Sequence, residues 1–300
     1  MAHSFWPCND ASMDASVKDF LAKRLASDPK SKAYYESLWN GHLSAGLANK
    51  HFVSEFTSGS TPKFFQRVWE MLLARHLRAC SHVITSRPEG EPDFRFEQGG
   101  LVIWVEAVSP ESGPDLSCEP PTTGTIVPHK EILLRWTTAF DAKWKMGIEY
   151  RRKGVIKPEE AYVIAIDGSQ LSRFPLPHGS SRMPYIVEAV FAMGPLAFKI
   201  DNKTGRFAGT AYTVRFVISN RNNAAVRTEA FFNQAYAGIS GVIGCVPPMF
   251  SEAILPIQVA YNPLAEVALK RGLFGLSAEE WTAELASADA DGQDWILKQL

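Results

Sequence analysis

The sequence predicts an α/β fold in which a mixed central β-sheet is flanked by helices. Residues 101–105 and 162–166 are continuous apolar runs, which is typical of strands buried on both faces. Residues 130–152 between them have helical periodicity, which gives the strand–helix–strand order of an α/β sheet. A chain of 300 residues with 46% hydrophobic and 21% charged residues can bury a core of this kind.

An N-terminal helical extension is predicted over residues 1–55. Two helices are expected there, separated by Pro29. The apolar positions that recur at helical spacing are Val17, Phe20, Leu21 and Leu25 in the first helix and Tyr35, Leu38 and Trp39 in the second. A polar stretch at residues 57–61 then leads into the core. We expect the extension to cover the core or to mediate a homodimer.

The core is predicted to begin with a helix over residues 62–79, for which Pro62 suits the first turn. Its broad apolar face is formed by Phe65, Val68, Trp69, Leu72, Leu73 and His76. Gln66 and Glu70 lie at the edge of that face, so both side chains are expected near the sheet.

A β-hairpin is predicted next. Residues 93–96 alternate polar and aromatic side chains, residues 97–100 supply turn residues, and residues 101–105 are the buried run. That run ends in a charge, Glu106, which is unusual for a buried strand. Asp93 and Glu106 should therefore lie near one end of the hairpin.

The helix over residues 130–152 carries a lysine within its apolar stripe. The stripe consists of Ile132, Trp136, Ala139, Met146 and Tyr150. At about 100° per residue, Lys143 projects near the centre of this stripe and Lys145 lies well outside it. A lysine that faces a sheet needs a carboxylate or a phosphate as its partner. The alternative is that its stem covers apolar surface while its ammonium group reaches water.

The predicted core spans residues 56–270. After the strand at residues 162–167 we expect a helix near residues 185–193. Further strands are predicted near residues 196–200, 212–217, 239–246 and 257–261. Residues 271–300 are predicted to form an acidic helical segment.

The hairpin carries a motif that resembles the PD-(D/E)XK nuclease superfamily, whose members have a restriction-endonuclease-like core. The motif is Pro92-Asp93, twelve intervening residues, and then Glu106-Ala107-Val108. The superfamily has a lysine where this chain has Val108. The resemblance covers the core from about residue 64 to residue 167.

The resemblance implies a metal-dependent phosphodiesterase. Glu70, Asp93 and Glu106 would surround Mg²⁺ or Mn²⁺, and Glu106 would also orient the attacking water. Lys143 would replace the lysine that is missing at Val108, because some members carry it on the following helix. A metal ion lowers the pKa of bound water and neutralises phosphate, and a lysine stabilises the developing charge. The expected substrate is nucleic acid, and DNA in particular.

Each of these residues also has a structural interpretation. Glu70 can be a solvated glutamate paired with Arg67 or Arg75, and Asp93 can cap backbone N–H groups in a turn. Two further hypotheses follow. One is a catalytically degenerate module that binds nucleic acid or a protein partner, which Val108 favours. The other is an unrelated α/β protein whose acids are structural.

Net charge and cysteine usage restrict the partners and the location. The formal net charge is −1, but residues 130–157 contain eight lysines or arginines and three acids, a local excess that could contact phosphates. No apolar stretch approaches the roughly 18 residues of a membrane span, so no membrane association is expected. Four cysteines lack paired spacing, which predicts reduced thiols. They are Cys8, Cys80, Cys118 and Cys245. Residues 1–6 lack a basic segment followed by an apolar run, so a cytoplasmic location is expected.

Overall fold

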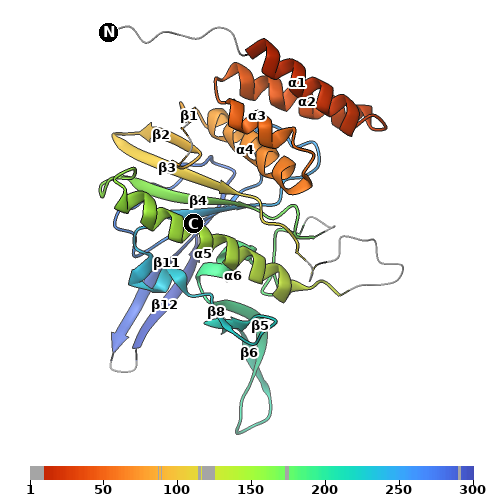
Figure 1. The fold of residues 1–300 in the computed structure, drawn as a ribbon. Coiled ribbons are helices and arrows are strands. Elements are labelled where there is room, and N and C mark those ends of the chain that lie inside the picture. Colours follow the sequence, from red (N-terminus) through yellow and green to blue (C-terminus); the bar gives the residue numbers. More distant parts are fainter. Residues whose placement is uncertain are drawn as a thin grey trace.

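The structure is a computed structural model that describes residues 10–86, 88, 90–113, 116, 126–172, 176–289 and 292–300. It confirms the α/β class: an eight-stranded mixed sheet lies between helices (Figure 1). The helices are α1 (Asp10–Arg24), α2 (Pro29–Ser44), α3 (Lys50–Phe56), α4 (Thr61–Ala79), α5 (His129–Arg152) and α6 (Tyr185–Val190).

The strands of the main sheet lie in the order β1-β2-β3-β4-β9-β10-β11-β12. They are β1 (Thr85–Ser86), β2 (Phe94–Gln98), β3 (Leu101–Val108), β4 (Ala161–Asp167), β9 (Gly241–Cys245), β10 (Gln258–Tyr261), β11 (Glu279–Asp289) and β12 (Gly292–Gln299). Two separate hairpins are formed by β5 (Met193–Ile200) with β6 (Phe207–Val214) and by β7 (Val217–Ser219) with β8 (Ala225–Arg227). Short 3₁₀ turns occur at Ala230–Phe232 and Gln234–Tyr236.

The predicted hairpin and the predicted crossover are both confirmed. Strands β2 and β3 are antiparallel, and Gly99 and Gly100 close the turn with φ values of 59° and 82°. Two consecutive positive φ values suit the right-handed twist of a two-residue hairpin and favour glycine at both positions. Helix α5 then connects β3 to β4, and these two strands are parallel.

Alternate residues of the central strands enter two different cores, which explains their continuous apolar runs. Val105 of β3 and Val163 of β4 belong to the core shared with α1, α2, α3 and α4. Trp104 and Ile164, one residue away in each strand, belong to the core shared with α5 and α6. The sheet therefore holds α4 and α5 on opposite faces.

The N-terminal extension packs on α4 through aromatic rings. Phe56 stacks on Phe64 with ring centroids 4.9 Å apart, and Trp39 stacks on Phe56 at 6.5 Å. The short helix α3 was not predicted. Asn49 begins it by accepting a hydrogen bond at its side-chain oxygen from the Phe52 N–H at 2.8 Å. The extension thus includes a third helix that ends at Phe56, beside the predicted boundary.

The prediction of an acidic helix at residues 271–300 is wrong. Strand β11 pairs in parallel with β10, and β12 pairs with β11, so the segment extends the main sheet. Its alanines, glutamates and leucines favour a helix, but Trp281 and Ala283 are buried on either side of the less buried Thr282, as in a strand.

No helix within the described ranges is both long enough and apolar enough to cross a membrane. Cys80 and Cys245 are free thiols, as predicted. Cys8 and Cys118 lie outside the described residues.

Replacing Gly147 with alanine should destabilise the fold by about 1–3 kcal/mol, because helix α5 packs closely on β4 there. A Cβ atom at Gly147 would lie 2.5 Å from Cε1 of the buried Tyr162. Urea unfolding of Gly147→Ala measures the change. Gly41→Ala in α2 is the matched control: no atom lies within 4 Å of its added Cβ, so it should leave stability unchanged or raise it by up to about 1 kcal/mol. Equal effects of the two substitutions would contradict the close packing of α5.

Candidate active site

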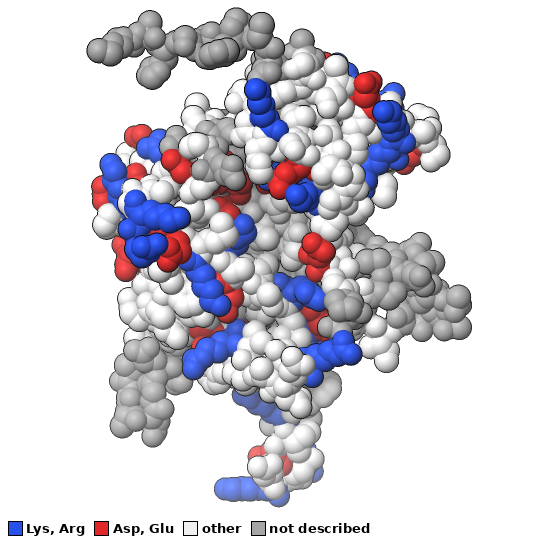
Figure 2. All heavy atoms as spheres, viewed as in Figure 1, with Lys and Arg blue, Asp and Glu red and all other residues white. Residues whose placement is uncertain are grey.

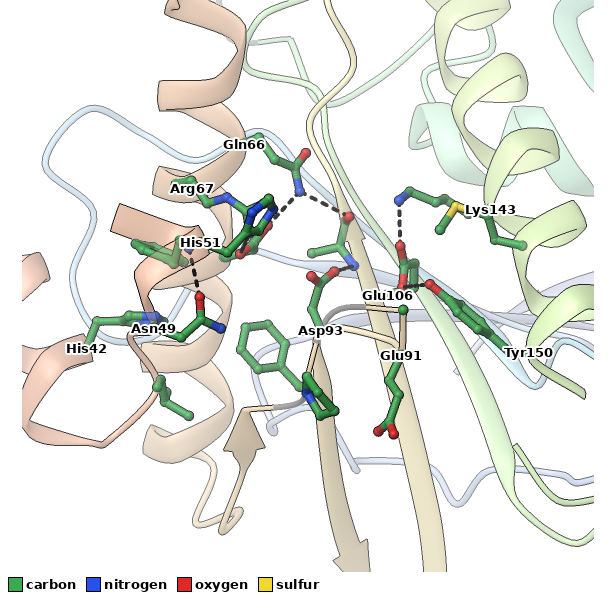
Figure 3. Close-up of a pocket in the computed structure, with 18 of the residues that line it drawn as sticks. His42, Asn49, His51, Gln66, Arg67, Glu91, Asp93, Glu106, Lys143 and Tyr150 are labelled. Atoms are coloured by element: carbon green, nitrogen blue, oxygen red, sulfur yellow. Dashed lines mark hydrogen bonds and ion pairs between the residues drawn. The ribbon is translucent and has the colours of Figure 1, made fainter. Parts of the chain in front are cut away.

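The four residues predicted to form a site line one cavity. Its volume is about 530 Å³, and α3, α4, the β2–β3 hairpin and α5 form its walls (Figure 3). Glu70 comes from α4, Asp93 precedes β2, Glu106 lies on β3 and Lys143 lies on α5. Residues from four separate segments therefore converge on one space.

Pairing between β2 and β3 sets Asp93 beside Glu106. Phe94 pairs with Val105, so the next step of the ladder places Asp93 opposite Glu106. Oδ2 of Asp93 accepts a hydrogen bond from the Ala107 N–H at 2.8 Å. Asp93 thus caps a backbone N–H, as the structural interpretation expects, but the N–H belongs to the neighbouring strand and the carboxylate still lines the cavity.

Lys143 meets Glu106, which confirms that this lysine faces the sheet and has a carboxylate partner. Its Nζ donates to Oε1 of Glu106 at 2.5 Å, and the side chains are 17% and 5% exposed. The Tyr150 hydroxyl, two helical turns further along α5, donates to Oε2 of Glu106 at 3.3 Å. Lys145 is exposed, as predicted. The role of Tyr150 beside Glu106 was missed, although its place in the same helical stripe as Lys143 was a usable signal.

Glu70 is buried and fully engaged with neighbours on its own helix. Arg67 donates to Oε2 of Glu70 at 2.5 Å, and Gln66 donates to Oε1 at 2.9 Å. The structural interpretation of Glu70 expected a solvated side chain paired with Arg67 or Arg75. The pairing with Arg67 is confirmed, but Glu70 is only 4% exposed and so is not solvated. Arg75 instead donates to the carbonyl oxygens of Ser251 and Glu252. Arg67 also binds Glu55 of α3, so one guanidinium group joins the N-terminal extension to the site.

Gln66 ties α4 to the end of β3. Its Nε2 donates to the Ala107 carbonyl oxygen at 3.2 Å, and its Oε1 accepts from the Ser109 N–H at 2.8 Å. The sequence placed Gln66 at the edge of the apolar face but did not indicate these backbone contacts. These hydrogen bonds fix the position of Glu70 relative to Ala107, whose N–H also donates to Asp93.

Asp93 makes ionisation of Glu70 and of Glu106 less favourable, because like charges would lie close together. Burial, followed by the charge of Asp93, raises the pKa of Glu70 to about 8, and Arg67 opposes the shift. Burial and then Asp93 raise the pKa of Glu106 to about 7, against the effect of Lys143. Burial also raises the pKa of Asp93, and Lys143 opposes this change. Arg67 and Lys143 therefore offset only part of the effect of burial, and the three carboxyl groups keep raised pKa values.

Across the described ranges, no group of three or more histidine, cysteine, aspartate or glutamate side chains comes together closely enough to hold a metal ion. A full protein cage is not what Mg²⁺ usually requires, because it keeps several waters and takes one or two carboxylates together with substrate phosphates. Asp93 and Glu106 provide hard oxygen donors of that number. Their raised pKa values mark a place where added positive charge would be favourable. The chemistry of these two residues thus fits Mg²⁺ or Mn²⁺, whereas both oxygens of Glu70 already accept hydrogen bonds from Arg67 and Gln66.

Comparison of this chain with protein-family models, with curated proteins and with solved structures gives no match. What the site can do therefore has to be argued from its own geometry.

The wall opposite the carboxylates comes from the N-terminal extension. Asn49, Lys50 and His51 line the cavity, and Figure 2 shows acidic and basic side chains together on the face between the N-terminal helices and the core. The Asn49 oxygen is held by the Phe52 N–H, so its NH₂ group is left to act as a donor (Figure 3). The cavity thus has one acidic wall and one wall of donors.

The basic cluster at residues 130–157 contributes less to this site than its charge indicates. Arg151 donates to three backbone carbonyl oxygens, those of Lys157, Glu160 and Gly238, and so supports local structure. Arg152 pairs with Glu149. Lys143 is the member of the cluster that lines the cavity.

Stability should fall as pH rises from 5 to 8, and Asp93→Asn should reduce that fall. Acids whose pKa is raised by folding hold protons that the unfolded chain has released, so the folded state loses its advantage as pH rises toward 7–8. The expected loss is on the order of 2–4 kcal/mol for wild type and smaller for Asp93→Asn, since Asp93 adds to the larger effect of burial on both glutamate pKa values.

Urea unfolding at pH 5, 6, 7 and 8 without divalent cations measures the dependence. Glu97→Gln removes an exposed acid from the same hairpin and is the matched control, expected to follow wild type. A slope in Asp93→Asn equal to that of wild type would contradict the electrostatic coupling.

Proposed function

We propose that this chain is a Mg²⁺- or Mn²⁺-dependent phosphodiesterase that cleaves nucleic acid, with DNA as the expected substrate. One observation carries the proposal: Asp93 and Glu106 of one hairpin, Glu70 of the preceding helix and Lys143 of the following helix line a single cavity. This is the arrangement that a resemblance to PD-(D/E)XK nucleases implies for a chain with Val108 in place of the lysine. A cytoplasmic location stays a prediction from the pattern of the N-terminal residues and the lack of a long apolar stretch.

Each residue has a distinct chemical role in this proposal. Asp93 and Glu106 bind the metal ion, which when bound supplies charge neutralisation and a more acidic water. Tyr150 fixes the orientation of Glu106 through its hydroxyl, so that Glu106 can accept a proton from the attacking water. Glu70, held by Arg67 and Gln66, adds negative charge beside Asp93 once the pH exceeds its raised pKa of about 8.

Lys143 supplies the ammonium group that Val108 cannot. Its ion pair with Glu106 keeps Nζ at the cavity, within reach of a phosphate that approaches the same carboxylate. A fixed positive charge near a phosphate undergoing attack stabilises the transition state more than the ground state. For this role, the position of the ammonium group matters more than whether the lysine comes from β3 or from α5.

The donor wall supports a phosphate-bearing substrate. Lys50 and His51 are exposed beside the cavity, and Asn49 presents its NH₂ group there. These side chains would contact backbone phosphates or sugars on either side of the cleaved bond, which gives affinity without base preference.

A second candidate function is a module that binds nucleic acid without cleaving it. Two observations favour it: Val108 stands at the lysine position, and Glu70 has both oxygens occupied by Arg67 and Gln66. In that case the buried carboxyl groups would have a structural role, and the donor wall would bind the strand.

Asp93→Asn should abolish metal-dependent cleavage and Lys143→Ala should lower turnover by about 10²–10³-fold with little change in metal affinity. The assay uses supercoiled plasmid, linear duplex and single-stranded DNA and RNA with Mg²⁺, Mn²⁺ or EDTA. Lys145→Ala, an exposed lysine two residues away on α5, is the control and should cleave like wild type.

Cleavage that survives Asp93→Asn would come from a contaminant. Unchanged turnover in Lys143→Ala would remove the lysine from the mechanism. If wild type binds an oligonucleotide but cuts none of these substrates, the second candidate function, binding without cleavage, is supported instead.

Mg²⁺ or Mn²⁺ should raise the melting temperature of wild type at pH 8, and less so at pH 5. At the lower pH, protonation of Glu70 and Glu106 competes with the cation, because their pKa values are raised to about 8 and about 7. Thermal melts with and without each cation measure the shift. Glu106→Gln should lose it, whereas Glu97→Gln should retain it. A shift of equal size in both variants would place the cation elsewhere.

A further inference from the structure

The charged groups of the proposed active site lie deep in the cavity. Glu70 and Glu106 are each 4% exposed, and the Lys143 side chain is 17% exposed. Lys50 and His51 line the same cavity but are exposed, so they lie nearer to its entrance. A phosphate can therefore reach the carboxyl groups only by entering the cavity, whose walls include α3, the β2–β3 hairpin and α5 (Figure 3).

The cavity has room for one nucleotide. Its volume is about 530 Å³, and pockets of this size enclose a single small molecule. A backbone phosphate is bonded to its sugar, so the sugar and the base have to follow the phosphate into the cavity. In an intact duplex each base is paired and stacked, and its extrusion costs free energy. In an unpaired strand the base has no pairing partner to leave.

Exposed apolar groups line the cavity beside the charged ones. Met146 lies one turn along α5 from Lys143 and is 37% exposed, and Pro88 is also exposed. A metal ion and a phosphate would contact the carboxyl and ammonium groups but would leave these apolar groups unused. The flat face of a base would cover them, because a methionine sulfur packs favourably against an aromatic ring. The lining thus matches a nucleotide together with its base.

We propose that the substrate of this site is an unpaired strand of nucleic acid: a single strand, an overhang or an unpaired stretch within a duplex. This inference rests on the function proposed above and adds the class of substrate to it. One nucleotide enters the cavity, with its phosphate beside Lys143 and its base against Met146. Lys50 and His51 contact the neighbouring phosphates nearer to the entrance.

Oligonucleotides of one sequence, made as DNA and as RNA, test the proposal with the full-length chain. They are a single strand, the fully paired duplex and a duplex with a central unpaired bubble. With Mg²⁺ or Mn²⁺, wild type should cleave the single strand about 100-fold faster than the duplex, because the duplex has to extrude a nucleotide first. Cuts in the third substrate should fall within the bubble.

Fluorescence anisotropy at pH 6 with EDTA tests the same preference without cleavage. The raised pKa values of Glu70 and Glu106 favour their neutral forms at that pH, which reduces repulsion of the strand. Wild type should bind the single strand about tenfold more tightly than the duplex.

Met146→Ala tests the placement of the base. It should weaken binding of the single strand about threefold and leave binding of an abasic strand of the same length unchanged. Ile148→Ala is the matched control: Ile148 lies on the same helix, is 47% exposed and does not line the cavity, so this variant should bind like wild type.

The outcomes separate this inference from the function on which it rests. Cleavage of the duplex as fast as the single strand, or cuts spread outside the bubble, would overturn the inference and leave the phosphodiesterase standing. Tighter binding of the single strand without cleavage of any substrate would overturn the phosphodiesterase and retain the unpaired strand as the ligand. Absence of both cleavage and binding would overturn both. An equal effect of Met146→Ala on the abasic strand would overturn the placement of the base.

Discussion

The burial of Glu70 and Glu106 beside the half-buried Asp93, around one cavity, is the constraint on which the positions of the surrounding elements depend. Each carboxyl group needs donors, and each donor comes from an element whose position is fixed by other packing. Glu70 receives Arg67 and Gln66 from its own helix, Glu106 receives Lys143 and Tyr150 from α5, and Asp93 receives the backbone of β3. The donors offset part of the cost of burying charge, and the rest remains as raised pKa values.

The N-terminal extension is coupled to this site through charge as well as through packing. Arg67 divides its guanidinium group between Glu55 of α3 and Glu70 of α4. Lys63 and His51 also lie near Glu55, at 3.3 Å and 3.7 Å. A displacement of α3 would therefore change the number of positive charges that face Glu70. The extension is part of the electrostatic environment of the cavity.

The sequence predicted the long, strongly patterned elements of the site better than its short helix and its tertiary contacts. The hairpin, helix α5 and the inward direction of Lys143 follow from periodicity, since these elements are long or strongly patterned. Helix α3 has seven residues and its pattern is too short to read. The β11–β12 hairpin was mistaken because Ala, Glu and Leu favour a helix, and pairing with β10 overrides that preference. Contacts of Gln66 with the β3 backbone depend on how α4 sits on the sheet, which no local pattern encodes.

Gly147 has a consequence for the lysine one turn before it. Because no side-chain atom separates this part of α5 from Tyr162, the helix rests directly on a ring, and the Tyr162 hydroxyl donates to the Lys143 carbonyl oxygen at 3.0 Å. This hydrogen bond anchors the backbone of Lys143 to β4. The ammonium group therefore moves by rotation about the bonds of its own side chain. The distance that the Lys143 ammonium group can reach into the cavity is therefore set by the length and rotamer of one side chain on a fixed backbone.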